Sequence, residues 1–302
     1  MNYIRNWFKG LKYSPAINTL IKIVPDDVYL RIKHRVYFGE KLDLENPKTF
    51  NQKINWLKLY DRKPEYTRMV DKFLVKEYVA SKIGEQYIVP TLEVWDNYDD
   101  IDWDSLPSQF VIKNTKGGGS TGVVICKDKN KFNINQAIKD LKKAEKIDIY
   151  GFSREWPYKD VKRRLIAEKY LVDESGEQLK DYKIFCFNGE PKFVEVDYDR
   201  FTDHKLNVYD LEWNFIDFYM SSRNDKNRII KKPVQLKKMI EFAKILSENI
   251  PFIRVDFYSI GDKIYFSELT LYPGAGEIDF HPVEYDRILG DMLELPKNKI
   301  NL

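Results

Sequence analysis

The sequence predicts an α+β fold, in which a mostly helical N-terminal region is followed by antiparallel strands. Three observations predict it: helical spacing of apolar residues within 1–85, two strand-like runs joined by a glycine-rich turn at 110–126, and a succession of short strands and hairpins after residue 165. A chain of 302 residues can form two or three subdomains, each with its own core. We find no internal repeat and no low-complexity tract.

The helical region is predicted from periodicity and start signals. Residues 51–59 and 70–79 each place apolar side chains at i, i+3 and i+4, which lines one face of a helix. Pro47 and Thr49 precede the first of these segments and are typical of a helix start. A strand-like stretch that opens at 88–90 and an acidic loop at 96–104 follow.

The glycine-rich flap, residues 110–126, is the most informative segment of the chain. Lys113 lies near the end of its first strand, and four glycines fall within the turn, which comprises Gly117, Gly118, Gly119, Ser120, Thr121 and Gly122. Backbone N–H groups in such a turn can surround phosphate oxygens, and Lys113 would add a positive charge. The segment is not a Walker A loop, and a strand follows where a dinucleotide fingerprint requires a helix. The alternative is an ordinary flexible hairpin.

After the flap, the pattern becomes progressively richer in strands. Asn188 to Pro191 form a tight turn between two strands, and Gly261-Asp262 forms another. The other expected elements, in chain order, are a helix at 135–144, strands at 165–171, 182–187 and 192–196, a helix at 235–248, and strands at 252–258 and 263–269.

Composition excludes several classes of protein. The 50 basic and 47 acidic residues leave a net charge of +3, which argues against a general polyanion-binding field and hence against nucleic acid. Hydrophobic residues make up 43% and aromatic residues 15%, which excludes a mainly disordered chain. No apolar run approaches the length of a membrane span, and the N-terminus has no signal-peptide core. We therefore expect a cytoplasmic protein.

The cysteines, the histidines and the N-terminal charge give weaker indications. Cys126 and Cys186 lie in strand-like apolar runs, so we expect buried free thiols rather than a disulfide framework or a thiolate zinc site. The histidines, at positions 34, 204 and 281, are too scattered to suggest a triad. Residues 1–41 carry eight Lys or Arg against three acids, interleaved with apolar residues. This basic segment is suited either to peripheral docking on the inner membrane face or to a solvated helix face packed on its own domain.

A second constellation lies on the expected hairpin of residues 252–269. Its two strands would present Asp256 and Glu268 close together, and Arg254 would share the face of Asp256 because it lies two residues away. Paired carboxylates on rigid strands suit Mg²⁺, which fills its other positions with water and phosphate oxygens. A plain polar face across the two strands is the alternative. The phosphate-binding flap makes the metal interpretation the better one, because phosphoryl transfer from ATP needs divalent cations as well.

Five short segments in order resemble the ATP-grasp superfamily and, within it, the TupA-like ATP-grasp family of polysaccharide-biosynthesis loci. The resemblance extends from about residue 46 to 296. The segments that carry it are Arg154-Glu155-Trp156, Ile166-Ala167-Glu168-Lys169-Tyr170-Leu171, Asp181-Tyr182-Lys183-Ile184-Phe185-Cys186-Phe187-Asn188-Gly189, Arg254-Val255-Asp256-Phe257-Tyr258 and Tyr265-Phe266-Ser267-Glu268-Leu269-Thr270. The resemblance implies an N-terminal helical, basic region at 1–65 and an ATP-grasp domain at 66–296. Within that domain, about 108–172 would cover the nucleotide and 173–296 would hold metal and substrate.

The resemblance also implies a set of nucleotide contacts. Residues 117–122 would close on the β- and γ-phosphates, and Glu168 would accept a hydrogen bond from the adenine amino group. Asp173 or Glu174 would hold the ribose. Three lysines would contact the phosphates, and three hinge residues would contact the adenine edge through their backbone; these are Lys72, Lys113 and Lys183, and Lys169, Tyr170 and Leu171.

At the reacting centre, Asp256 and Glu268 resemble the two magnesium carboxylates. Thr270 stands where many such ligases have asparagine, and its hydroxyl is a weaker ligand than an amide carbonyl. Arg254 and the backbone of Gly274 resemble the groups that stabilise negative charge on the acyl centre. A fixed guanidinium and a loop N–H typically supply about 3–4 kcal/mol of such stabilisation.

These roles imply an ATP- and Mg²⁺-dependent ligase that joins a carboxylate to an amine through an acyl phosphate. The substrates would be a carboxylate, for instance a uronic acid of a glycan, and an amine or amino acid. An ATP-grasp kinase and a non-catalytic ATP-binding scaffold remain alternatives. A glycosyltransferase is another, because D-x-D occurs at 197–199, 100–102 and 102–104. A basic, aromatic cluster, comprising Arg154, Trp156, Lys162, Arg163 and Arg164, suits either an acidic glycan or a solvated face.

Overall fold

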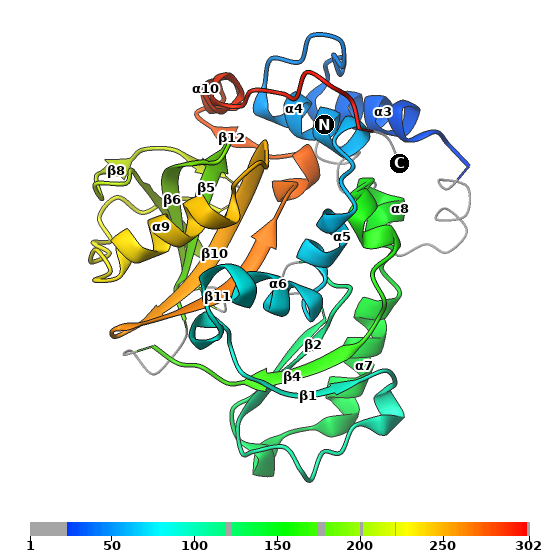
Figure 1. Cartoon of the computed structure of the whole chain (residues 1–302), viewed down its shortest axis with the longest axis vertical. Helices are drawn as coiled ribbons and strands as arrows, with labels where there is room; N and C mark the ends of the chain where they lie inside the picture. The colour runs from blue at the N-terminus through cyan, green and yellow to red at the C-terminus, as the bar shows by residue number, and fades with distance from the viewer. Residues whose placement is uncertain (1–22, 119–121, 174–178, 200–201, 221, 301–302) are drawn as a thin grey trace. The chain divides into compact units, whose positions relative to one another are not determined.

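The computed structural model describes residues 23–118, 122–173, 179–199, 202–220 and 222–300 (Figure 1). Its helices and antiparallel sheets confirm the predicted α+β class. The chain forms two compact units. Unit 1 comprises the described parts of Met1–Lys41, Lys63–Lys76 and Val89–Leu171, and unit 2 comprises those of Leu42–Arg62, Glu77–Ile88 and Val172–Leu302.

The elements follow the expected order. The helices are α3 (Asp26–Phe38), α4 (Phe50–Tyr60), α5 (Glu65–Val70), α6 (Leu74–Ile83), α7 (Ile134–Glu145), α8 (Ile149–Ser153), α9 (Leu236–Leu246) and α10 (Glu284–Met292). The strands are β1 (Thr91–Trp95), β2 (Phe110–Asn114), β3 (Val123–Cys126), β4 (Leu165–Lys169), β5 (Asp181–Phe187), β6 (Glu190–Tyr198), β7 (Lys205–Tyr209), β8 (Phe215–Ile216), β9 (Tyr219–Met220), β10 (Phe252–Ile260), β11 (Lys263–Thr270) and β12 (Phe280–His281).

Unit 1 is built on a four-stranded antiparallel sheet in the order β1-β4-β2-β3. Phe110 and Ile112 alternate with Lys113 along β2, so their side chains point to opposite faces. The first face packs on α7, where Leu141 joins the two apolar residues in a buried core (Figure 1). Lys113 therefore lies on the face turned away from α7.

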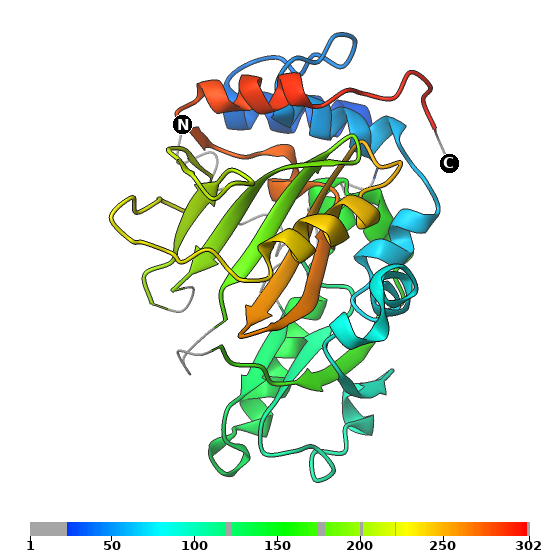
Figure 2. The same cartoon turned by 60° about the vertical axis from the view of Figure 1, so that its left-hand side comes forward.

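Unit 2 is built on a six-stranded antiparallel sheet in the order β11-β10-β5-β6-β7-β8. Helix α9 packs against β5, β6 and β10, and both views show it lying across the strands (Figures 1 and 2). Cys186 and Phe257 lie on this covered face, next to Ala243 and Phe242 of α9. The residues between them along β5 and β10 point to the other face, which carries the charged side chains described below.

The segment predicted as one helix at 70–79 is divided, so this prediction was wrong. Helix α5 ends at Val70 and α6 begins at Leu74. The carboxylate of Asp71 accepts hydrogen bonds from the N–H groups of Phe73 (2.8 Å) and Leu74 (3.2 Å) and starts the second helix. Such local capping competes with helix propagation, although apolar periodicity continues through the break.

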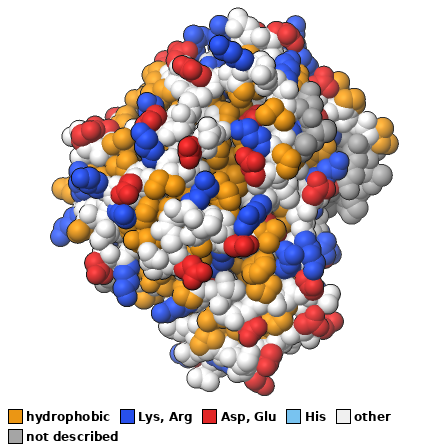
Figure 3. Space-filling model, in the orientation of Figure 1, with side chains coloured by type: hydrophobic (Ala, Val, Ile, Leu, Met, Phe, Trp, Pro, Cys, Tyr) orange, Lys and Arg blue, Asp and Glu red, His pale blue; other side chains and the backbone are white. Residues whose placement is uncertain are grey.

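Other expectations of the sequence are confirmed over the described residues. Cys126 and Cys186 are buried free thiols. The face of the molecule seen in Figure 3 carries basic and acidic side chains side by side, as the balanced composition predicts. No helix in the described parts is long and apolar enough to cross a membrane. Of the basic N-terminal segment, residues 1–22 lie outside the described residues.

Candidate active site

The nucleotide-facing candidates of unit 1 meet at one buried carboxylate. Glu168 of β4 has only 6% of its side chain exposed. Its Oε1 lies 2.5 Å from Nζ of Lys76 on α6, and its Oε2 lies 2.5 Å from Nζ of Lys113 on β2. Lys76 also donates to the carbonyl of Val89 at 2.7 Å. One carboxylate thus holds two ammonium groups together, which leaves this cluster with a net positive charge.

Electrostatics within this cluster favour the ionised carboxylate. Burial by itself would raise the pKa of Glu168, but the charges and hydrogen bonds of Lys113 and Lys76 outweigh it and lower that pKa below its ordinary value. Burial lowers the pKa of Lys76, although Glu168 opposes the shift. Both oxygens of Glu168 are engaged by the lysines, whereas the sequence predicts a contact with the adenine amino group. Lys76 is the residue that sequence reasoning missed.

The root of the glycine-rich flap is fixed by hydrogen bonds. Thr115 is fully buried; its N–H donates to the carbonyl of Arg164, and its hydroxyl accepts from the Arg164 N–H, both at 2.9 Å. The N–H of Asn114 donates to the carbonyl of Gly122 at 2.9 Å and closes the turn. Gly122 has φ +77°, and a Cβ there would lie 2.8 Å from Nδ2 of Asn114. Glycine is therefore required at this end of the turn.

The other flap and hinge candidates are placed as follows. Gly117 is buried and Gly118 is exposed, whereas Gly119, Ser120 and Thr121 lie outside the described residues. Lys72 is half-buried, and its N–H donates to the carbonyl of Thr115 at 3.3 Å.

The hinge follows β4 directly. The N–H of Lys169 donates to the carbonyl of Pro90 at 3.0 Å, so this donor is already engaged. Tyr170 and Leu171 are half-buried. Asp173 is buried in an ion pair with Lys180 at 2.9 Å, and Glu174, the other candidate for the ribose, lies outside the described residues.

In unit 2, four charged residues occupy one row across the sheet. The register pairs Glu268 of β11 with Asp256 of β10, Asp256 with Lys183 of β5, and Lys183 with Glu195 of β6. Residues directly opposite one another on neighbouring strands share a face and lie close together. The sequence-predicted pairing of Asp256 and Glu268 is therefore realised in the register, and Lys183 lies on the same row.

Arg254 is bound to this row through Asp256. Its Nε and Nη2 donate to Oδ1 and Oδ2 of Asp256 at 2.7 and 2.6 Å, and Nη2 lies 4.0 Å from Oε2 of Glu268. Burial opposes the charge on the guanidinium, but Asp256 outweighs it and raises the pKa of Arg254. Burial also raises the pKa of Asp256, even beside the guanidinium. Thr270 pairs with Arg254 in the register and follows Glu268 by two positions, so it lies on the same face.

Lys183 is held by two further carboxylates that sequence reasoning did not assign to the site. Its ammonium lies 3.2 Å from Oε1 of Glu195 and is also paired with Asp197. Burial raises the pKa of Glu195, although Lys183 opposes the shift. Asp197 belongs to one of the D-x-D patterns, but it is buried against this lysine. A conserved-looking surface motif is thus part of the charged row, and the signal for this role is the period-two alternation along β6.

The donor set at Asp256 and Glu268 suits a hard divalent cation, which prefers carboxylate and hydroxyl oxygens. Four carboxylates in and beside the row face two cationic side chains, so the face carries surplus negative charge: Glu268, Asp256, Glu195 and Asp197 against Arg254 and Lys183. Within the described residues there is no cluster of three or more His, Cys, Asp or Glu arranged to hold a metal by themselves. The residues fit a cation that shares its coordination with a ligand such as phosphate.

A family model described as TupA-like ATPgrasp matches residues 52–294, which is most of the chain. The chain belongs to the TupA-like ATP-grasp family. The ATP-grasp fold expected from the sequence is thereby confirmed, and ATP-grasp ligases use ATP with a divalent metal. A comparison with curated proteins finds no match.

Among solved structures, the chain is similar to three ATP-grasp proteins at low identity. D-alanine-D-alanine ligase from Helicobacter pylori is 17% identical over 81% of this chain and 69% of that chain, with a TM-score of 0.43. D-alanyl-alanine synthetase A from Vibrio cholerae is 12% identical over 74% and 61%, with a TM-score of 0.43. A RimK domain ATP-grasp protein from Sphaerobacter thermophilus is 10% identical over 78% and 70%, with a TM-score of 0.42. The chain thus spans less than two thirds of the Vibrio enzyme.

In this ATP-grasp chain, α4 fixes the loop that contains Gly274. Asn51 donates to the carbonyl of Ile278 at 2.9 Å and accepts from its N–H at 2.8 Å. Asn55 donates to the carbonyl of Gly276 at 3.0 Å, and Lys58 donates to that of Ala275 at 2.8 Å. These three polar residues are buried, although periodicity alone suggests that the polar face of this helix is solvated.

Gly274 itself has a backbone that other residues adopt at a cost. Its φ is +56°, and an added Cβ would lie 2.6 Å from Cγ1 of Ile278. It lies in the turn Pro273–Gly276, which α4 holds through the contacts above. A loop fixed in this way can keep a backbone N–H in one direction.

Part of the basic, aromatic cluster is structural, so neither sequence interpretation holds for it. Arg154 is 1% exposed; its Nε lies 3.1 Å from Asp26, and its guanidinium lies over the ring of Tyr29 at 4.2 Å. Trp156 is also buried, and its ring packs near that of Tyr66. These residues join α3 to the region around α8 within unit 1.

Proposed function

We propose that this protein is an ATP-dependent carboxylate–amine ligase that works through an acyl-phosphate intermediate. The observation that carries the proposal is the charged row of unit 2, in which Asp256 and Glu268 are paired beside Arg254 and Lys183. Family membership supplies the ATP-grasp context. The physical argument is that phosphoryl transfer needs fixed charges at both the phosphate and the acyl centre.

In the proposed reaction, a carboxylate oxygen of the substrate takes the γ-phosphoryl group of ATP, and ADP leaves. The amine nitrogen then attacks the acyl carbon, inorganic phosphate leaves with the bonding pair, and the nitrogen loses a proton. When bound, Mg²⁺ would neutralise phosphate charge from Asp256 and Glu268, with Thr270 as a weaker third donor. No covalent intermediate with the protein is needed.

The protein residues have separate roles in this proposal. Lys72 and Lys113 of unit 1 would contact phosphates, and Lys183 would do so from unit 2. The hinge, Lys169 to Leu171, would contact the adenine through the backbone groups that remain after the Lys169 N–H has bonded to Pro90. Arg254 and the N–H of Gly274 would stabilise negative charge at the acyl centre.

The substrate classes rest on the resemblance to polysaccharide-biosynthesis proteins. We propose a surface polysaccharide or its precursor as one substrate, with a uronic acid as the carboxylate, and an amine or amino acid as the other. The protein would act in the cytoplasm or at the inner membrane face. The buried position of Asp197 against Lys183 argues against a glycosyltransferase that uses this D-x-D pattern.

The decisive experiment is Glu268→Gln, assayed for carboxylate-dependent release of ADP and for nucleotide binding. The substitution removes one charge but leaves the shape, so we expect turnover to be abolished while binding of a non-hydrolysable ATP analogue is largely retained. Hydroxylamine added to the wild type should yield a hydroxamate, because only an acyl phosphate gives this product. ADP release without hydroxamate would favour a kinase that acts on a hydroxyl, and normal turnover in the variant would contradict the metal assignment.

A further inference from the structure

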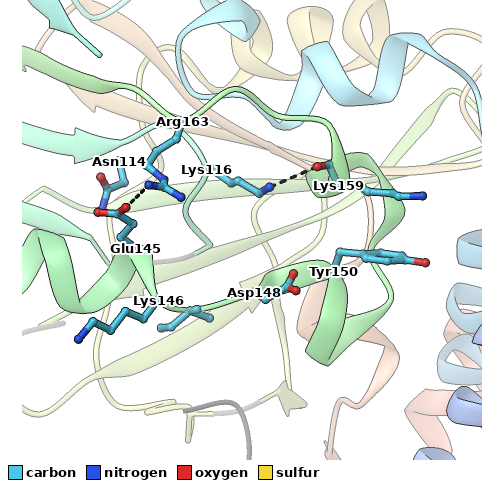
Figure 4. Close-up of a pocket in the computed structure, with 9 residues that line it drawn as sticks. Asn114, Lys116, Glu145, Lys146, Asp148, Tyr150, Lys159 and Arg163 are labelled. Atoms are coloured by element: carbon cyan, nitrogen blue, oxygen red, sulfur yellow. Dashed lines mark hydrogen bonds and ion pairs between the residues drawn. The ribbon is translucent and has the colours of Figure 1, made fainter. Parts of the chain in front are cut away.

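Unit 1 contains a pocket of about 510 Å³ at the end of β2, beside the junction of α7 and α8 (Figure 4). In this view, Arg163 and Lys116 lie along one side of the pocket, and Asp148 and Tyr150 lie along the other. None of these residues belongs to the nucleotide, metal or acyl-centre sets described above. The pocket therefore needs its own explanation.

The pocket lies on the opposite face of the flap sheet from the predicted phosphate lysine. Asn114, which lines the pocket, follows Lys113 directly on β2, so the two side chains point to opposite faces. Asn114 donates to the carbonyl of Leu141 on α7 at 3.1 Å, whereas Lys113 pairs with Glu168. A ligand in the pocket would thus be separated from Lys113 by the sheet itself.

Cationic groups predominate in the lining. Four cationic side chains face two carboxylates: Lys116, Lys146, Lys159 and Arg163 against Glu145 and Asp148. Within the described residues, no ion pair involves Lys146 or Lys159. The surplus of positive charge within a concave site favours an anion.

The two carboxylates have other partners and do not cancel this surplus. Glu145 binds Arg163 through one terminal nitrogen, Nη1, and a guanidinium has five N–H donors, so others remain. Asp148 is the N-cap of α8 and accepts from the N–H of Gly151 at 2.9 Å. Lys116 donates to the carbonyl of Lys159 at 3.3 Å, which holds its ammonium group at the pocket rim.

We propose that this pocket binds an oxyanion, a carboxylate or a phosphate, carried by the acceptor substrate. That the oxyanion belongs to the acceptor rests on the proposed ligase function; that the pocket binds an oxyanion rests on its lining alone. Arg163 provides the planar donors that suit both groups, and the lysines provide point charges. Lys116 immediately precedes Gly117, so the pocket lies at the root of the glycine-rich flap.

The test uses three sugars that differ in one group: glucose 6-phosphate, glucuronate and glucose. Binding is measured by isothermal titration to the wild type, to Lys159→Gln/Arg163→Gln and to Lys139→Gln. Lys139 is exposed on α7 and lies outside the pocket, so its variant controls for a change in net charge. Each charge-assisted contact contributes roughly tenfold in affinity.

We expect one or both anionic sugars to bind and glucose not to bind. The double variant should weaken this binding by about tenfold or more, while Lys139→Gln matches the wild type. Preference for glucose 6-phosphate over glucuronate would identify a phosphate, and the reverse a carboxylate. Failure of both sugars to bind, or equal binding by the double variant, would overturn the proposal.

A parallel titration with Mg²⁺ and a non-hydrolysable ATP analogue separates this proposal from the ligase. If the analogue binds and the anionic sugars do not, the pocket proposal fails and the proposed function stands. If the anionic sugars bind in the pocket and the analogue does not, the ligase proposal fails and the pocket remains an oxyanion site.

Discussion

The two charged clusters of this protein are built on sheets in the same way but carry opposite surplus charge. In unit 1, one carboxylate, Glu168, binds the ammonium groups of Lys76 and Lys113. In unit 2, the row and its flanking residue Asp197 place four carboxylates against Arg254 and Lys183. The first is left with a positive charge and the second with negative charge.

This difference teaches what each cluster is prepared to bind. Buried charge without full compensation is costly, so each cluster is stabilised by a ligand that supplies the missing sign. A polyphosphate supplies negative charge to the first cluster, and a divalent cation supplies positive charge to the second. The magnesium complex of a nucleoside triphosphate carries both, which agrees with membership of an ATP-grasp family.

The largest effect is expected from removing the carboxylate that holds Arg254. Asp256→Ala leaves a guanidinium that is 15% exposed without its bidentate partner. Breaking a buried pair in this way costs about 3–5 kcal/mol of unfolding free energy, which urea denaturation would measure. The double variant Arg254→Met/Asp256→Ala removes both charges and should recover part of the loss. Equal stability of the wild type and Asp256→Ala would show that the pair is solvated.

A smaller and pH-dependent effect is expected in unit 1. Glu168→Gln removes the charge that binds two lysines and should cost about 2–3 kcal/mol at neutral pH. Because Lys113 and Lys76 hold the pKa of Glu168 below its ordinary value against burial, its ionised form contributes stability above the unfolded-state pKa. That contribution is lost as the pH falls through the lowered folded-state pKa.

Denaturation at a series of pH values from 7 downwards checks this sign. The difference between the wild type and Glu168→Gln should be constant from neutral pH to about 5 and should shrink below that. Glu248→Gln, at an exposed position on unit 2, should show no such dependence. A difference that grows towards acid pH would mean that burial dominates the Glu168 carboxyl.

Two glycines of unit 2 allow the strain in the Gly274 loop to be measured separately from conformation. Gly274 and Gly261 have φ of +56° and +58°, but a Cβ at Gly274 would meet Ile278 at 2.6 Å, whereas at Gly261 it would meet nothing within 4 Å. Both alanine variants should lose about 1 kcal/mol through the left-handed backbone. Gly274→Ala should lose roughly 1–3 kcal/mol more through crowding, and it alone should lower kcat if its N–H acts at the acyl centre.

Sequence reasoning succeeds where the signal lies within one strand or one hairpin. Lys113 beside the glycine turn, and Asp256 opposite Glu268, follow from alternation and from the expected hairpin, and the structure places them accordingly. The α+β class follows from the same local patterns. Such features depend on neighbours in sequence, which is why they can be predicted without knowing how distant segments meet.

The remaining features depend on contacts between distant segments. Glu168 meets Lys76 only because α6 and β4 come together, and apolar periodicity gives no sign of it. Asn51 lies on what periodicity treats as a solvated face, yet it is fully buried against Ile278. Arg154 lies in a basic stretch but forms part of the interior. Each is a polar residue whose burial is compensated by a partner more than 90 positions away.

The smallest effect compares the two sheets through their single thiols. Cys126 lies in the sheet of unit 1 and Cys186 in that of unit 2, and burial raises the pKa of both, that of Cys186 to about 12. A thiol that is buried and neutral reacts only when its surroundings open. We expect both to react with a thiol reagent at least about 100-fold more slowly than in unfolded protein. Measured in Cys186→Ser and Cys126→Ser respectively, Cys126 should be the faster, because its four-stranded sheet is the smaller of the two; equal rates at every denaturant concentration would instead mean that the two units open as one.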